Sequence, residues 1–182
     1  MFRALNAIFE KKLTHGITVL LLVIAAQAIY FYMIFVSIPT LETFTHGLTI
    51  LDMLPTGYTA TYVHELFNAL GVQGRDFYLY HQIPIDLLYP AFFAISNSAL
   101  LLYLFKKAAF KQYRFICFTP FIVALFDYIE NLCTAHMLFY FPDFHSGFPV
   151  LASIATVAKS IFTLLFFGIL IYYLFATTKN AL

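Results

Sequence analysis

Charged residues are scarce in this sequence of 182 residues: only 10% are Asp, Glu, Lys or Arg, whereas 62% are hydrophobic. A soluble globular domain is about a quarter charged and about half apolar. The scarcity therefore excludes an ordinary soluble domain, a disordered chain and a basic nucleic-acid-binding arm. Because the mean hydropathy is +0.85, the chain needs lipid as its solvent, and we predict a multi-pass membrane protein.

Cysteine is almost absent, since Cys117 and Cys133 are the only two, and tryptophan is missing altogether. Both cysteines fall in one apolar run, and in a helix they would lie about 24 Å apart, too far for a disulfide. Neither belongs to a CxxC or Cys/His pattern, which excludes a disulfide-rich scaffold and disfavours thiol redox chemistry. The sequence also lacks glycine-rich phosphate loops and internal repeats, and no motif indicates a cofactor.

What the sequence does contain is long apolar runs. Each of four runs is long enough for a helix to cross a bilayer, which takes about 20 residues. They predict an all-α fold, a four-transmembrane-helix bundle that forms a single membrane domain over residues 1–182. We expect the first run to be a retained signal anchor, because it is too long for the core of a signal peptide and lacks a cleavage site. The expected spans are 17–38, 84–105, 115–140 and 150–175.

The positions of the basic residues predict the orientation of these spans. Lys and Arg concentrate before the first span, between the second and third, and after the fourth, whereas Arg75 is alone between the first and second. By the positive-inside rule, both termini and the short basic loop lie on the cytoplasmic side or its equivalent. We expect the basic loop to contact anionic lipid headgroups and not nucleic acid. The cytoplasmic residues are Arg3, Lys11, Lys12, Lys106, Lys107, Lys111, Arg114 and Lys179.

The outer segment 39–83 is too apolar to be a simple linker. Its run TATYVHELFNALG has apolar residues at helical spacing, and Gly71 is placed to end that helix. The following run, GRDFYLYHQIP, predicts a second short helix that leads into the second span. We therefore expect a helical cap on the outer side of the bundle, with tyrosines that bridge lipid and water.

Ionisable residues occur within the expected spans, where they are costly and usually paired or functional. Asp127, Glu130, Asn131 and Thr134 are spaced i, i+3, i+4, i+7 and share one face of the third span. Counting the helical rise from the outer ends places Lys159 of the fourth span level with Glu130, with Asp127 one turn deeper. Two acids and one base leave one excess negative charge, which a proton, a cation or a cationic ligand group would balance.

Further polar residues surround this group and predict a pocket that opens outward beneath the cap. We expect Asp127 and Glu130 to be acid/base or cation-binding groups, with Lys159 as their counter-charge. Arg75 and Asp86 would lie at the mouth, where Arg75 pairs with Asp86 or Asp52 or meets a ligand's phosphate or carboxylate. The ligand-binding candidates are Asp86, Tyr89, Asn97, Asn131, Thr134 and Arg75.

Other uses of these polar residues stay open. A Lys–Asp/Glu pair flanked by Asn, Ser and Thr can simply fix the register of packed helices, and the cluster could also serve an ion or proton path. No pair of histidines has diagnostic metal-ligand spacing, and HELFN lacks the second His of a zinc protease motif, so we assign no metal site. No GxSxG motif supports serine hydrolase chemistry. The outer histidines are His46, His64, His81, His136 and His145.

The run GYTATYVHELFNALGVQGRDFYLYHQIPIDLLYP, with LFDYIEN and a Lys in the last span, resembles an uncharacterised family of small four-span membrane proteins, mainly bacterial. That resemblance covers nearly the whole chain and implies no activity. The architecture is also similar to the sterol-isomerase and sigma-2-receptor-like fold, whose members bind lipophilic amines in an acid-lined pocket. The acids here lie on other spans, so no catalytic residue is carried over.

The sequence favours a membrane-embedded pocket protein that binds or transforms a lipophilic small molecule or lipid. The alternative is a non-catalytic accessory or assembly subunit of a larger membrane complex, which suits the phenylalanine-rich surfaces and the lack of a sharp catalytic motif. An ion-coupled carrier is disfavoured, because the chain has only four spans and no inverted repeat. Membrane lipids are expected partners in every case.

Overall fold

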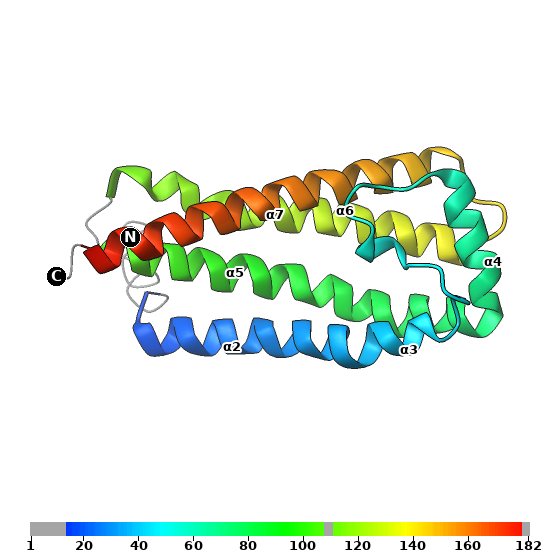
Figure 1. The fold of residues 1–182 in the computed structure, drawn as a ribbon, viewed down its shortest axis with the longest axis horizontal. Helices are drawn as coiled ribbons and strands as arrows, with labels where there is room; N and C mark the ends of the chain where they lie inside the picture. The colour runs from blue at the N-terminus through cyan, green and yellow to red at the C-terminus, as the bar shows by residue number, and fades with distance from the viewer. Residues whose placement is uncertain (1–13, 108–110, 180–182) are drawn as a thin grey trace, which may run out of the picture.

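The computed structural model describes residues 14–107 and 111–179, and within them the chain is helical with no strand. Helices α2, α5, α6 and α7 run along the long axis of the molecule, and α4 crosses one end of them (Figure 1). The elements in chain order are α2 (Gly16–Tyr32), η1 (Met33–Ser37), α3 (Ile38–Glu42), η2 (Leu51–Met53), α4 (Ala60–Phe77), η3 (Tyr78–Gln82), α5 (Ile83–Lys107), η4 (Lys111–Phe118), α6 (Thr119–Phe139) and α7 (Gly147–Lys179).

In the described part of the chain, four helical stretches are long and apolar enough to cross a membrane, the same number as the spans predicted from the sequence. The predicted boundaries agree closely for the first, third and fourth, whereas the second stretch begins earlier than predicted because α4, η3 and α5 follow one another without a break. The four stretches are Gly16–Glu42, Ala60–Lys106, Phe115–Phe139 and Gly147–Phe175.

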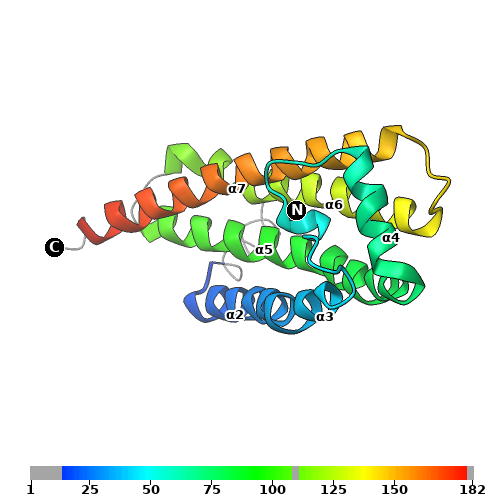
Figure 2. The same cartoon turned by 45° about the vertical axis from the view of Figure 1, so that its right-hand side comes forward.

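The four long helices are arranged in the order α2, α5, α6, α7, each packing mainly on its neighbour in that series. Helices α2 and α7 are therefore the two edges of the arrangement and lie apart from each other (Figures 1 and 2). The start of α2, η4 and the end of α7 share one end of the molecule, which we call the basic end. The opposite end, crossed by α4, is called the cap end.

Helix α4 forms the cap because one of its faces is apolar at helical spacing. Thr59 caps its first turn by accepting a hydrogen bond from the backbone N–H of Tyr62 at 3.2 Å. Gly71, which was expected to end the helix, takes φ 60° and ψ −170°, so the chain bends there and continues as a helix into α5. The buried face consists of Val63, Leu66, Phe67 and Leu70.

The segment between α3 and α4, residues 43–59, folds back into the bundle and is called the 43–59 loop. Figure 1 shows it running from the cap end toward the middle of α7, in the space between α7 and the α2–α5 pair. Ile50 and Leu51 in this loop are fully buried. The backbone N–H of Tyr58 donates to Ser153 Oγ on α7 at 2.9 Å. The loop thus fills the cap-end half of the space between the two edge helices.

Gly57 is the position where this loop passes closest to α7. Its φ of 86° lies in the left-handed region, which favours glycine. A Cβ atom added there would lie 2.6 Å from Ser153 Oγ and 3.1 Å from Val157 Cγ2. Close packing of the loop on α7 therefore requires glycine, because the positive φ disfavours other residues and because a Cβ atom would clash with α7.

Candidate functional site

The polar face of α6 is buried between its neighbouring helices. Glu130 is 0% exposed, and Asp127, Asn131 and Thr134 are also buried. Their i, i+3, i+4, i+7 spacing places them on one side of a helix, as the sequence predicts. The small residues Ala152 and Ala155 on α7 are buried as well, which brings α7 close to this face.

Lys159 on α7 lies between the two acids of α6. Its Nζ is 3.2 Å from Asp127 Oδ1, and it also forms an ion pair with Glu130 Oε2. Thr156, one turn earlier on α7, donates to Glu130 Oε1 at 2.7 Å. Lys159 thus reaches both acids; the count of helical rise predicts Glu130 at its level and Asp127 one turn deeper. The Lys159 and Asp127 side chains are 17% and 13% exposed, so both reach the edge of the packed region.

A hydrogen-bond network extends from Asp127 to the other helices. Asn131 Nδ2 donates to Asp127 Oδ1 at 3.3 Å and to the backbone carbonyl of Asp86 at 2.9 Å. Gln82 Nε2 donates to the Asp86 carboxylate at 2.8 Å, and Ser37 Oγ donates to Gln82 Oε1. All these side chains are buried. The network therefore joins α6 to α5, η3 and η1 in the interior of the bundle.

The 43–59 loop brings a fourth acid, Asp52, to this network. Its carboxylate accepts a hydrogen bond of 2.6 Å from the hydroxyl of Tyr78, which is fully buried. Asp52 lies near enough to interact electrostatically with Asp86, Asp127 and Lys159, and with Glu130. Four carboxyl groups and one lysine therefore take part in this network, whereas the sequence predicts two acids level with Lys159.

Tyr58, also in the loop, reaches residues of both α6 and α7 with its hydroxyl. Its hydroxyl lies beside Thr156 and Thr134, and burial together with the nearby charge of Glu130 raises its pKa above the ordinary value. Tyr58 OH and Thr134 Oγ are buried and make no hydrogen bond within the described residues. The polar interior is therefore not fully satisfied by its own side chains.

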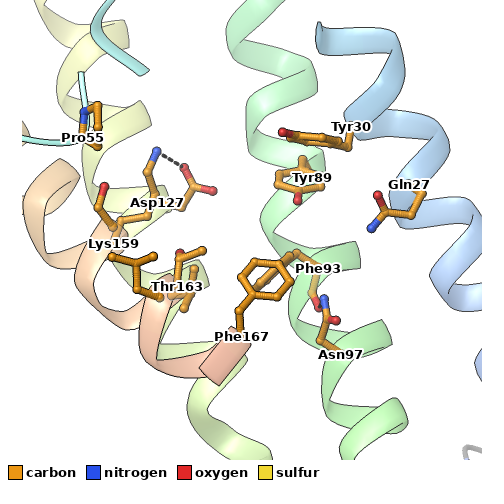
Figure 3. Close-up of a pocket in the computed structure, with 13 residues that line it drawn as sticks. Gln27, Tyr30, Pro55, Tyr89, Phe93, Asn97, Asp127, Lys159, Thr163 and Phe167 are labelled. Atoms are coloured by element: carbon orange, nitrogen blue, oxygen red, sulfur yellow. Dashed lines mark hydrogen bonds and ion pairs between the residues drawn. The ribbon is translucent and has the colours of Figure 1, made fainter. Parts of the chain in front are cut away.

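A cavity of about 600 Å³ lies next to the Asp127–Lys159 pair, on the basic-end side of the 43–59 loop. Figure 3 shows the charged pair on one side and the aromatic rings of α2 and α5 on the other. Pro55 of the loop is part of the wall. The lining residues are Gln27, Tyr30, Pro55, Tyr89, Phe93, Asn97, Val123, Asp127, Lys159, Ser160, Thr163, Leu164 and Phe167.

The mouth of this cavity is on the side of the bundle, between the edge helices α2 and α7. Four apolar or aromatic lining residues are also surface residues: Leu164 is 74% exposed, Phe167 44% and Tyr30 39%, and Pro55 of the 43–59 loop is exposed as well. The cap end, where the sequence places the opening, is covered instead by α4 and by the 43–59 loop. The difference arises because hydropathy does not reveal that α2 and α7 stay apart.

The structure divides the candidate residues predicted from the sequence into three groups. Tyr89, Asn97, Asp127 and Lys159 line the cavity. The second group lies behind these residues in the buried polar network and comprises Glu130, Asp86, Asn131 and Thr134.

Arg75 forms the third group, because it is remote from the cavity and does not form the predicted pair with an acid. Its guanidinium donates to the backbone carbonyl of Phe67 at 2.7 Å and lies 4.6 Å from the ring centroid of Phe141. Within the described residues no ion pair links it to Asp52 or Asp86. Arg75 therefore holds the bend of α4 against the α6–α7 connection. The sequence could not predict this position, because it depends on the direction that the chain takes after Gly71.

The sequence pattern does not mark Tyr30, Pro55, Tyr58 or Tyr78 as site residues. It indicates Asp52 only as a partner for Arg75. All but Tyr30 and Tyr78 belong to the 43–59 loop, which has no periodic pattern. The sequence feature that indicates burial of this loop is its composition, which is too apolar for a segment that lies in water.

His64, His81 and His136 contact aromatic rings. His64 stacks on Phe144 with ring centroids 4.6 Å apart, and His136 stacks on Phe148 at 3.8 Å. In the part of the chain that the structure describes, no three His, Cys, Asp or Glu residues are placed to hold a metal ion together.

Comparisons with protein-family models, with curated proteins and with solved structures found no match to this chain. The family resemblance suggested by the sequence therefore remains a prediction.

Proposed function

We propose that this chain is an integral membrane protein that binds one lipid or lipophilic small molecule in its lateral cavity. The observation that carries this proposal is the combination of an exposed apolar mouth with a partly buried ion pair inside. The mouth is formed by Leu164 and Phe167, and the ion pair by Asp127 and Lys159. A volume of about 600 Å³ is in the range that holds a small organic ligand.

The position of the mouth supports entry from the lipid phase. Leu164 and Phe167 lie in the middle of the apolar stretch Gly147–Phe175, and the neighbouring surface of α7 is also apolar. When this stretch crosses a bilayer, the mouth faces hydrocarbon. A lipophilic molecule can then enter without passing through water.

The polar cluster is larger than helix packing requires. Removing charges from water is costly, and an excess of acids over bases adds to that cost. Here the carboxyl groups of Asp52, Asp86, Asp127 and Glu130 share one buried network with Lys159, and the Asp127–Lys159 pair borders the cavity. A binding or acid/base role for these groups explains why such a cluster is kept beside an open cavity.

We propose the membrane orientation given by the basic residues, with both termini on the cytoplasmic side. The basic end then faces the cytoplasm, and α4 with Tyr62 and His64 lies at the outer surface. In this orientation, Lys106 is cytoplasmic and the α6–α7 connection is external.

The experiment is to extract the protein in mild detergent and identify any co-purified lipid or lipophile by mass spectrometry. Thr163→Phe fills the cavity from its α7 wall and should remove the bound molecule. Leu165→Phe is the matched control, because Leu165 lies on the same helix, is exposed and does not line the cavity. Loss of the molecule in both variants, or in neither, would contradict the proposal.

A second candidate, the accessory subunit, is favoured by the surface of α2. Only Val19 and Ala26 are buried in this helix, and it packs mainly on α5. A broad apolar face is therefore available to another membrane protein. Stoichiometric partners in a mild-detergent preparation would support this candidate, and a chain that purifies alone would count against it.

A further inference from the structure

The depth of the charged pair restricts what kind of lipophile can place its polar group there. Lys159 stands about three turns, or ~18 Å, from the start of α7 at Gly147. The apolar stretch continues beyond it to Phe175. In a bilayer with a hydrocarbon core of about 30 Å, Lys159 therefore lies near the middle. The zwitterionic headgroup of a phospholipid would have to leave the interface to reach it, which is costly.

The charges beside the cavity restrict the polar group itself. The ammonium of Lys159 has three N–H donors, and within the described residues its partners are Asp127 and Glu130. One donor is thus left for an acceptor oxygen in the cavity. An anionic group would add to the nearby acids, and an amine in the cavity would meet Asp127, whose carboxylate already pairs with Lys159. An uncharged carbonyl or hydroxyl oxygen meets neither penalty.

The two walls of the cavity restrict the shape of the molecule. Aromatic rings form the α2–α5 wall: Tyr30 and Tyr89 have centroids 5.7 Å apart, and Tyr89 and Phe93 are 5.9 Å apart. The opposite wall, from α7, presents the small side chains of Ser160 and Thr163. Figure 3 shows Phe167 reaching from α7 toward Phe93 below this slot. A flat ring fits between such walls, because aromatic faces gain from offset stacking.

From these three restrictions we infer that the cavity takes an uncharged lipophile whose polar end is a flat ring bearing an oxygen acceptor, such as an alkylated quinone. The ring lies against Tyr89 and Phe93, its oxygen accepts a hydrogen bond from Lys159, and its alkyl tail leaves past Leu164 into the lipid. This inference depends on the proposed function, because it names the class of ligand for the same cavity.

The test is a binding series on the purified full-length protein with four probes that differ mainly in the polar end. These are a decyl-substituted benzoquinone, decylamine, decanoate and a short-chain phosphatidylcholine, each measured by thermal stabilisation and by native mass spectrometry. We expect the quinone to bind about tenfold or more tightly than the other three, as one charge-assisted hydrogen bond and ring stacking would give. Equal or tighter binding of the amine, the carboxylate or the phospholipid would overturn the inference while leaving the proposed function intact.

Two phenylalanine variants separate ring recognition from general hydrophobicity. Phe167→Leu removes a ring at the slot and should weaken quinone binding several-fold, with decylamine binding unchanged. Phe35→Leu is the matched control: Phe35 is exposed on the α2 side and does not line the cavity. An equal effect of both variants would contradict the ring slot. If no probe binds and no lipophile co-purifies, the proposed function itself fails.

Discussion

At the scale of single residues, Lys159 has the strongest expected effect on stability. Lys159→Met would leave Asp127 and Glu130 buried without their counter-charge, and losses of this kind are about 3–5 kcal/mol. We expect a lower free energy of unfolding, measured by denaturant titration in mixed micelles. The triple variant Lys159→Met, Asp127→Asn, Glu130→Gln should recover most of this loss, since no unpaired charge remains. A single variant as stable as the unmodified protein would show that the pair contributes little.

A variant of Asp127 distinguishes a ligand-binding role of this acid from a role in helix packing. Asp127→Asn keeps the shape of the side chain and its place beside Asn131, but removes a charge at the cavity edge. We expect this variant to fold and to change the affinity for the cavity ligand, because Asp127 helps to hold the Lys159 ammonium. Asp143→Asn is the control, because Asp143 is exposed in the α6–α7 connection. Unfolding of Asp127→Asn without any change in ligand affinity would favour a structural role.

At the scale of elements, the 43–59 loop depends on Gly57. Gly57→Ala places a Cβ 2.6 Å from Ser153 Oγ in a backbone conformation with φ 86°, and strain of this kind costs about 1–3 kcal/mol. We expect faster hydrogen exchange over residues 43–59 together with a lower unfolding temperature. Gly168→Ala in α7, where an added Cβ meets nothing within 4 Å, should be neutral or slightly stabilising. Similar behaviour of the two variants would mean that the loop is not seated on α7.

The loop also depends on the hydrogen bond between Tyr78 and Asp52. Tyr78→Phe keeps the buried ring but removes the 2.6 Å bond, and losses of a charge-assisted bond of this kind are about 1.5–3 kcal/mol. We expect residues 43–59 to become more accessible to a protease, with the other helices unchanged. Tyr80→Phe serves as the control because Tyr80 is 69% exposed. Equal protection in both variants would contradict this role of Tyr78.

Elements with a periodic pattern could be predicted from the sequence, whereas the 43–59 loop could not. Hydropathy gives the long helices, and helical spacing gives the buried face of α4 and the shared face of Asp127 and Glu130. The loop has no hydrophobic periodicity. Asp52 joins the polar network only because the loop packs beside Tyr78. Its burial is a tertiary effect that depends on where α7 lies.

At the scale of the whole molecule, the main feature that could not be predicted from the sequence is which helices pack side by side. Any of several arrangements of four apolar helices satisfies the same hydropathy. The order α2, α5, α6, α7 leaves the two edge helices apart, and this separation moves the cavity mouth to the side of the bundle. The level of Lys159 with Glu130, by contrast, follows from helical rise alone.

The proposed orientation is testable on intact cells. Cys117 and Cys133 are buried and should react slowly, so single added cysteines can report exposure. A membrane-impermeant maleimide should label Asp143→Cys from outside, but label Lys106→Cys only after the membrane is opened. The reverse pattern would overturn the orientation, and labelling of both from outside would contradict the four-span topology.

The seat of the 43–59 loop on α7 also has a consequence for synthesis. Tyr58 and Ser153, which meet at 2.9 Å, are 95 residues apart in the chain. At a translation rate of about 5–20 residues per second, Ser153 emerges ~5–20 s after Tyr58. During that interval, the loop and its Asp52 cannot pack on α7, although α2 has already been made. The newly made chain therefore passes through a stage in which this apolar loop is exposed, and completion of α7 ends that stage.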